Sequence, residues 1–338
     1  MTDQQSNNYK WFVLAILTVV YAFNFIDRQI LVILQEPIKA ELGLSDTQLG
    51  LLTGFSFAVV YVTAGIPIAW LADRSNRRNI VAVSLGIWSV MTALSGIVQN
   101  YTQLLLARLG VGLGEAGGSP PSHSMLSDYF PEEQRGTALS IYTTGIYLGI
   151  FFGYFAGGWI ADTYGWRNAF FIVGIPGVVL AFLLLLLVRE PPRTVLPNAV
   201  ENEKASFKET IVFLLQRPAF WWIALGCSTA SFVGYGNGNF FPSLLIRNYG
   251  LTVTEVGMFM GVISGSTGML GTFLGGYLAD RWGKRDKRWY VRIALWGLIL
   301  SLPLSYYTLL GSEPLYVVLA YTPAHILNTL YLGPCIAI

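Results

Sequence analysis

Long apolar runs recur along the whole chain, and they constrain the fold more than any other feature. A helix needs about 20 apolar residues to cross the ~30 Å hydrocarbon core of a bilayer. Ten runs of suitable length are found, at 11–34, 48–72, 80–98, 102–124, 136–161, 168–188, 218–246, 254–279, 289–310 and 314–337. Membrane β-strands are shorter and alternate in polarity, unlike these runs. The sequence therefore predicts an all-α membrane protein with ten spans.

Composition supports this class and argues against an enzyme. Hydrophobic residues make up 54% of the chain and charged residues 12%, which leaves too little charge for a soluble surface. The two His and two Cys show no metal-ligand spacing, and Cys227 and Cys335 are interpreted as small buried residues within spans. No nucleophile–base arrangement or phosphate loop is recognisable. We expect no enzymatic activity, metal or cofactor, and no nucleic-acid partner.

The distribution of basic residues predicts the orientation in the membrane. Lys and Arg cluster in the loops after the second, sixth and eighth runs, whereas the opposite loops carry only Lys39, Arg167 and Arg247. The positive-inside rule then places the N-terminus in the cytoplasm. The first run is too long for a cleavable signal peptide. Short loops favour a bacterial inner-membrane protein.

A long polar break at 189–216 divides the chain. It separates a six-helix bundle at 1–188 from a bundle of four helices at 217–338, which we expect to be incomplete. The end of the break, 207–215, has apolar residues at helical spacing and predicts a helix on the membrane surface.

Two similar decapeptides occupy equivalent positions in these bundles. AWLADRSNRR covers 69–78 and GYLADRWGKR covers 276–285. A single copy could be an ordinary basic loop, but two copies indicate an internal repeat. The candidate gate residues in the copies are Asp73, Arg74, Arg77, Arg78, Gly276, Asp280, Arg281, Gly283 and Arg285.

GYLADRWGKR resembles a loop motif of the major facilitator superfamily, whose fold has two pseudo-symmetric six-helix halves. The first copy departs from the motif at Ala69 and Asn76, where glycines are usual. The resemblance implies that Asp280 approaches the fifth helix near Arg135 and Gly136, and that Asp73 meets an eleventh helix. It also implies that the glycine-rich fifth and eighth helices meet between the halves. Ten spans suggest a chain truncated after the tenth helix rather than a native ten-helix variant.

Four charged residues lie deep inside predicted spans: Asp27, Arg28, Arg108 and Glu115. A charge at this depth costs at least about 2.5–3.5 kcal/mol. Helix geometry predicts that Asp27 pairs with Arg108, while Arg28 faces Glu115 or a cavity. The acids are candidate proton carriers, and the arginines either tune them or bind an anion. A static salt-bridge cluster is the alternative.

The second bundle has no charges at this depth but offers aromatic and neutral polar side chains. The candidates for a substrate cavity are Tyr235, Asn237, Asn239, Phe240, Phe241, Tyr321, His325 and Asn328. Such a wall suits an amphipathic ligand whose charged end lies in the first bundle. Each residue could instead serve packing, and His325 in particular could be a hydrogen-bonded packing residue.

Several motifs in the first bundle resemble the Spinster branch of the superfamily: NFIDR at 24–28, ARLGVGLGEAGGSP at 107–120, DYFPEEQRGTALSIY at 128–142 and LVREPPR at 187–193. Gly117 and Gly118 depart from the bulkier residues of the lipid-carrying animal proteins. The resemblance implies a proton-linked carrier of lysophospholipids or sphingoid lipids, and it maps the branch's acidic and basic residues onto Asp27, Arg108 and Glu115.

We therefore expect a monomeric, proton-coupled secondary transporter that moves an amphipathic or lipid-like anion by alternating access. Membrane lipid, protons and this substrate are the expected partners. A transporter of a small organic acid or sugar acid is the first alternative. A non-transporting membrane receptor or scaffold is the second.

Overall fold

The computed structural model describes residues 3–193, 212–213 and 215–337, and its regular elements are helical. Most of the expected linker at 189–216 lies outside the described residues, including most of the predicted surface helix at 207–215. The first half contains α1 (Asp3–Ile33), α2 (Gln35–Leu42), α3 (Asp46–Gly50), the π-helical turn η1 (Leu51–Phe55), α4 (Ser56–Ala72), α5 (Arg77–Ser95), α6 (Tyr101–Glu115), α7 (Ser119–Tyr129), α8 (Glu132–Tyr164) and α9 (Trp166–Leu187). The second half contains α11 (Pro218–Tyr249), α12 (Val253–Gly283), α13 (Trp289–Leu310), α14 (Pro314–Thr329) and α15 (Leu332–Ala337).

Eight helices in the described part of the chain are long and apolar enough to cross a membrane. The other two expected spans coincide with α6 followed by α7, and with α11. The fourth span is broken because α6 ends at Glu115 and α7 starts at Ser119, with two prolines in its first turn. Side chains at the loops start several helices: Asn76 caps α5, Asn100 caps α6, and Thr252 forms a capping box on α12.

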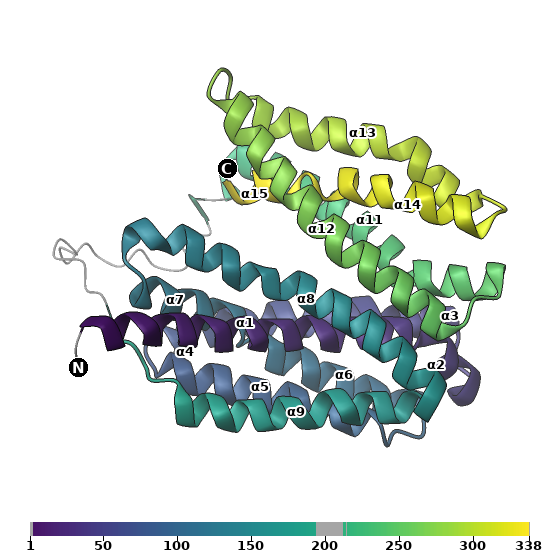
Figure 1. The fold of residues 1–338 in the computed structure, drawn as a ribbon, viewed down its shortest axis with the longest axis horizontal. Coiled ribbons are helices and arrows are strands. Elements are labelled where there is room, and N and C mark those ends of the chain that lie inside the picture. The colour runs from purple at the N-terminus through teal and green to yellow at the C-terminus, as the bar shows by residue number, and fades with distance from the viewer. Residues whose placement is uncertain (1–2, 194–211, 214, 338) are drawn as a thin grey trace.

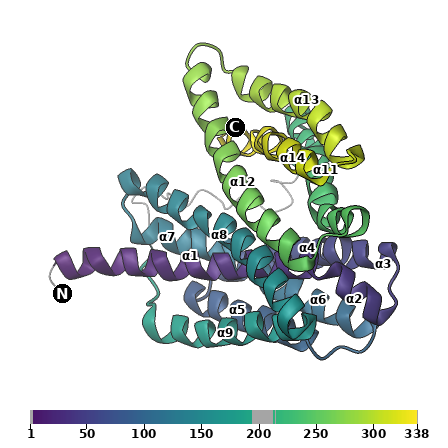
Figure 2. The same ribbon diagram turned by 45° about the vertical axis from the view of Figure 1, so that its right-hand side comes forward.

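The helices form two bundles that cross at α8 and α12 (Figure 1 and Figure 2). In the first half α1 packs along α8, and α5 packs between α6 and α9. In the second half α12 and α13 pack on α14. The bundles contact each other mainly through α8 and α12, so the position of these two helices sets the shape of the space between the halves.

The glycines of α8 and α12 have different packing partners. Gly145 and Gly149 face α1, where an added Cβ at Gly145 would lie 2.7 Å from the carbonyl oxygen of Thr18. Only at Gly158 does a glycine of α8 meet α12, with the carbonyl oxygen of Val253 2.6 Å from an added Cβ. The expected contact between the glycine-rich fifth and eighth helices is therefore formed, while most glycines of α8 let α1 approach closely.

On α12, by contrast, four glycines lie against α8, and one of them, Gly268, packs on the ring of Tyr147. Gly257 packs on the backbone of Tyr154, and Gly261 and Gly265 pack on Phe151. The close approach between the halves therefore depends on small residues of α12 and on larger side chains of α8.

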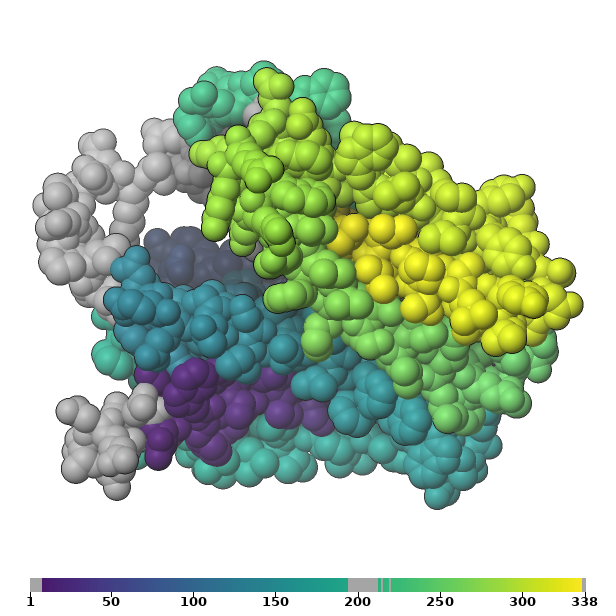
Figure 3. Space-filling model, turned by 45° about the horizontal axis from the view of Figure 1, so that its top comes forward, coloured from purple at the N-terminus to yellow at the C-terminus, as the bar shows by residue number. Residues whose placement is uncertain are grey.

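The two halves touch at one end and diverge at the other. At the closed end, formed by α2, α3 and the start of α12, the backbone N–H of Thr254 donates to Asp162 at 2.7 Å. The contact along α8 and α12 continues to Tyr147 and Thr272, whose hydroxyls are 2.6 Å apart. Beyond them Phe273 is 67% exposed, and an added Cβ at Gly136 would have no neighbour within 4 Å. Figure 3 shows a hollow between the halves at this open end.

Candidate functional site

The four charges inside the first half form two buried ion pairs. Arg108 Nη1 lies 3.2 Å from Asp27 Oδ1, as helix geometry predicted. Arg28 Nε donates to Glu115 Oε2 at 2.7 Å, which selects one of the two partners expected for Arg28. Asp27 also accepts a hydrogen bond from the hydroxyl of Thr92 at 2.5 Å. Helices α1, α5 and α6 thus meet at these side chains.

Arg28 is the only one of these four side chains that retains clear exposure. Its side chain is 17% exposed, whereas those of Asp27, Arg108 and Glu115 are 1%, 3% and 0% exposed. Of the four charged side chains, that of Arg28 is therefore the one with surface left for a further contact.

Three aromatic rings surround the guanidinium of Arg28. They belong to Phe25, Phe57 and Tyr61, and their centroids lie 4.7 to 5.2 Å from its Cζ. Such rings attract a cation through their negative faces and also present apolar surface. The residues next to the exposed charge are therefore suited to a ligand that is part anionic and part apolar.

Several polar atoms around the ion pairs are buried without a hydrogen-bond partner among the described residues. They are Glu115 Oε1, Arg108 Nε and Asn24 Oδ1. Each lacks a partner that its burial would ordinarily require, because an unmade hydrogen bond at such a site costs about 1–3 kcal/mol. Each of these atoms can therefore take part in a further hydrogen bond.

In the second half, the aromatic candidates form a stack whose polar atoms are bonded within that half. Tyr321 stacks on Phe241 with centroids 4.4 Å apart, and on His325 at 5.4 Å. The hydroxyl of Tyr321 lies 3.2 Å from that of Ser264, and His325 Nδ1 lies 2.8 Å from the hydroxyl of Thr267. This stack offers ring surface rather than free polar groups.

Two asparagines predicted to line the cavity have other roles. Asn328 points to α13, where it accepts a hydrogen bond from Ser301 at 2.7 Å and donates to Ser305 at 3.3 Å. Asn239 lies at the closed end, where its backbone carbonyl accepts from the side chain of Gln35 at 2.7 Å and its side-chain amide donates to the backbone carbonyl of Thr53 at 3.4 Å. The side-chain amide of Asn328 is thus bonded within the second half, whereas Asn239 connects the two halves.

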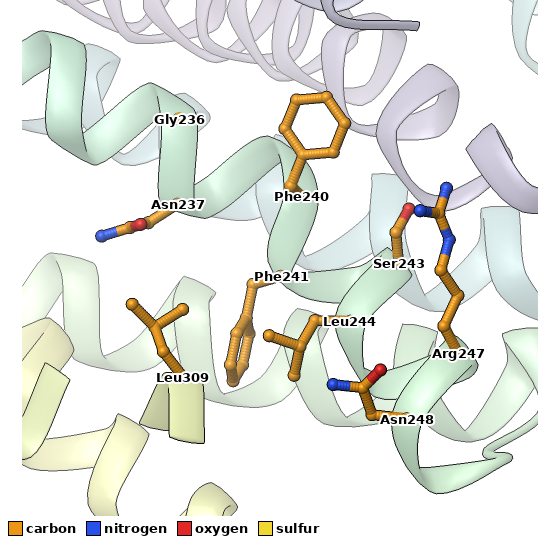
Figure 4. A pocket seen from close by; sticks show the side chains of 9 residues that line it. All are labelled: Gly236, Asn237, Phe240, Phe241, Ser243, Leu244, Arg247, Asn248 and Leu309. Carbon is orange, nitrogen blue, oxygen red and sulfur yellow. The ribbon is translucent and has the colours of Figure 1, made fainter. Parts of the chain in front are cut away.

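The remaining candidates of α11 lie around an open pocket. Asn237, Phe240 and Phe241 line it together with Leu309 of α13 (Figure 4). Phe240 and Phe241 point to different sides of α11, and Phe240 reaches Gly50 in the first half. Tyr235 is 59% exposed. The second-half residues predicted to line the substrate cavity thus lie on several surfaces rather than on one.

The first copy of the repeated decapeptide is built into a buried ion cluster. Arg77 Nε lies 2.7 Å from Glu190, and its Nη1 lies 2.5 Å from Asp128. Glu190 also accepts from the backbone N–H of Arg78 at 2.9 Å. Arg193 donates to backbone carbonyls of the loop after α4, including that of Asp73. The segment that follows α9 therefore holds this copy of the motif in place through ion pairs and hydrogen bonds.

The charged side chains of the second copy are exposed, and the contacts described for them lie at the surface. Tyr290 donates to Asp280 at 3.0 Å, and Arg281 donates to Tyr277 at 3.2 Å. Arg135 donates to the carbonyl oxygen of Phe130 instead of meeting Asp280. The implied contact between Asp280 and the start of α8 is thus not formed, because α8 and α12 diverge at this end.

Comparisons with known proteins agree with the fold and the motifs. Residues 17–334 match the Major Facilitator Superfamily. This chain belongs to that superfamily. Its members are transporters and not enzymes, and the chain is accordingly a multi-pass membrane protein. The resemblance to the Spinster branch is confirmed by a solved bacterial homologue of the human lysosomal transporter Spinster, in an inward-facing, unoccupied conformation. The two share 34% identity and a TM-score of 0.86, over 97% of this chain and 74% of that one.

Two relatives within the superfamily have different descriptions. An MFS-type efflux pump of Mycolicibacterium smegmatis is 36% identical over 99% of this chain and 77% of its own length. A probable galactarate/D-glucarate transporter of Bacillus subtilis is 27% identical over 80% of this chain and 65% of its own length. This chain therefore spans only part of the length of either relative.

Sequence reasoning missed several residues of these clusters. Asp128 and Glu190 lie inside the quoted motifs, so the motifs themselves were the available signal. Thr92 had no such signal, since it is an ordinary threonine in an apolar run. Arg247 was noted only for orientation, although it bridges the halves through Glu36 and Asp46.

Proposed function

We propose that this protein is a proton-coupled secondary transporter that moves an amphipathic or lipid-like anion by alternating access. The observation that carries the proposal is the pairing of Arg28 with Glu115. Arg28 is the charged residue with surface left for a ligand, and Glu115 is the buried acid that holds it at 2.7 Å. The anion and the proton can therefore bind together, one to each member of this ion pair.

Coupling follows from the charge balance of this site. Asp27, Arg28, Arg108 and Glu115 sum to zero when all are ionised. Binding a monoanion to Arg28 would leave one uncompensated negative charge in a poorly solvated site, which is costly. A proton on Glu115 removes that excess and releases the guanidinium for charge-assisted bonds to the anion. One proton and one negative charge are then bound together and move together.

The surroundings of the site support an amphipathic rather than a polyhydroxylated substrate. Phe25, Phe57 and Tyr61 adjoin the exposed guanidinium. On the second half, Asn239 and Asn328 are already hydrogen-bonded to protein groups. A sugar acid needs several free partners for its hydroxyls, whereas an acyl or sphingoid chain needs apolar surface.

Alternating access would proceed from the conformation described above. If the N-terminus is cytoplasmic, as its basic loops suggest, the open end faces the cytoplasm and the protein is inward-facing in a bacterial inner membrane. The approach of α12 to α8 at the open end would then occlude the site. In that movement Asp280 would come near Arg135, where the resemblance places it, and the protein would work as a monomer.

The test is uptake into proteoliposomes at two values of internal pH, with oleoyl lysophosphatidic acid and D-glucarate as separate probes. We expect proton-gradient-dependent flux of the lysolipid, and loss of that dependence in Glu115→Gln. Glu133→Gln is the matched control, because Glu133 is an exposed carboxylate at the start of α8. Asp27→Asn should also reduce coupling, since it frees Arg108 to compete for Glu115.

Three outcomes would overturn parts of this proposal. Unchanged coupling in Glu115→Gln and Asp27→Asn would leave a static salt-bridge cluster. Flux of D-glucarate without lysolipid flux would favour the small-acid alternative, which the relative from Bacillus subtilis supports. Binding of either probe without any flux would favour a receptor or scaffold.

A further inference from the structure

Cys227 of α11 and Cys335 of α15 lie side by side although 108 residues separate them. Their sulfur atoms are 3.1 Å apart. One turn further along α11, the hydroxyl of Ser231 lies 3.5 Å from that of Tyr331, which directly precedes α15. These two contacts define a seam between α11 and the segment 331–335 at the start of α15.

The location leaves the thiols accessible. Both cysteines are half-buried rather than enclosed. They lie toward the open end, because Cys335 follows Gly333, which packs on Gly276 near the end of α12. Neither thiol is therefore enclosed by the described part of the chain.

The distance between the two sulfur atoms is not much longer than a disulfide bond. A disulfide bond is about 2.05 Å long, so the two sulfur atoms need to approach by only about 1 Å. Side-chain rotation and small helix shifts supply such a movement readily. Neither cysteine is bonded to the other in the structure, where both are free thiols.

We propose that Cys227 and Cys335 are an oxidation-sensitive dithiol that a small-molecule disulfide converts into an intramolecular disulfide. One thiolate attacks the small disulfide, forms a mixed disulfide and expels one small thiolate. The second cysteine then attacks the mixed disulfide and expels the other. Two protein thiols lose two electrons, the small disulfide gains them, and the two protons end on the released small thiols.

The crosslink would fix α11 to α15. Elsewhere α11 is loosely covered: Trp222 and Phe232 are 75% and 82% exposed. A covalent bond at this seam would therefore restrain the helix that follows the linker and that faces the first half. In a reducing compartment such a bond is transient and responds to the redox state. This proposal does not depend on proton coupling or on the substrate.

The test uses the purified protein in detergent, treated with glutathione disulfide at neutral pH and then with N-ethylmaleimide. We expect a product that has lost two hydrogen atoms, carries no maleimide, and yields one linked peptide containing both cysteines. Reduction with dithiothreitol should restore two labelled thiols. The oxidised product should also unfold at a higher temperature than the reduced protein.

A matched variant moves one thiol by a single turn. In C227S/S231C the new thiol lies on the same face of α11, opposite Tyr331 instead of Cys335. It should give glutathione adducts and no internal crosslink. Equal crosslinking in this variant would overturn the proposal, because it would indicate random encounter. Stable glutathione adducts or intermolecular dimers as the sole oxidised products of the unmodified protein would overturn it as well.

Discussion

The two halves of the molecule carry similar decapeptides in very different surroundings. In the first half Arg77 is buried among Asp128, Glu190 and a backbone carbonyl. In the second half the equivalent residue, Lys284, is exposed. The difference arises outside the motif, since Glu190 belongs to the segment after α9. A repeated sequence therefore fixes where a loop lies, while its neighbours decide whether the loop is buried.

The same contrast holds at the depth of the membrane. The first half contains two buried ion pairs with unpartnered polar atoms beside them. In the described part of the second half, neutral residues such as Tyr321 and His325 occupy the comparable depth and are hydrogen-bonded to their own half. The charges described inside the spans thus lie in the first half, while the second half presents neutral side chains at this depth.

Breaking the buried cluster of the first motif copy should have the largest effect on stability. Arg77→Met leaves Asp128 and Glu190 facing each other without their shared cation, which we expect to cost about 3–5 kcal/mol. Lys284→Met is the matched change in the second copy and should alter the free energy of unfolding by less than about 0.5 kcal/mol. Chemical unfolding of both variants in detergent measures the difference. Equal losses would show that burial does not distinguish the copies.

A smaller difference is expected for hydrogen bonds to threonine inside the two halves. Thr92→Val removes a donor to the buried carboxylate of Asp27 and should cost about 1.5–3 kcal/mol, because bonds to charged groups are the stronger ones. Thr267→Val removes a neutral contact to His325 and should cost about 0.5–1.5 kcal/mol. The same unfolding measurement compares them. A larger cost in the second half would contradict the assignment of charge to the first half alone.

The pH dependence of flux sharpens this comparison. Thr92→Val should change it, since Asp27 belongs to the charged cluster. Thr267→Val should leave it unchanged, because its partner lies outside that cluster.

The sequence predicted those parts of the fold and site that depend on a single helix or on helix depth. Apolar runs located the spans, and the depths of Asp27 and Arg108 predicted their pair. The direction of a side chain was harder to predict. Asn328 is hydrogen-bonded to α13, and an asparagine in an apolar helix gives no indication of which neighbour it meets.

Contacts between distant segments and between the halves were beyond prediction. The proximity of Cys227 and Cys335 results from packing of α11 on α15, which no spacing of two isolated cysteines reveals. The contact expected between Asp280 and the start of α8 depends on conformation, and the open end of this structure keeps them apart. A motif can imply contacts that form in different conformations, whereas a structure shows the contacts of one conformation.

The smallest effect is expected where the halves meet at the closed end. Arg247 of α11 lies 2.7 Å from Glu36 and 2.6 Å from Asp46, and its side chain is 34% exposed. An exposed pair contributes about 0–1 kcal/mol, so Arg247→Ala should shift the balance between open and closed ends by up to about fivefold. Spin labels at Gln134 and Arg281, in a background without other cysteines, would report the separation at the open end.

The direction of that shift is what identifies Arg247 as a latch. Removing it should populate distances shorter than those of the unmodified protein, because weakening the closed end lets α8 and α12 approach at the open end. Lys39→Ala is the control: Lys39 also contacts Asp46, but from within the first half. An equal shift in Lys39→Ala would assign the effect to the charge of Asp46. If Arg247→Ala caused no shift, the packing of the α12 glycines on α8 would be the contact that holds the closed end.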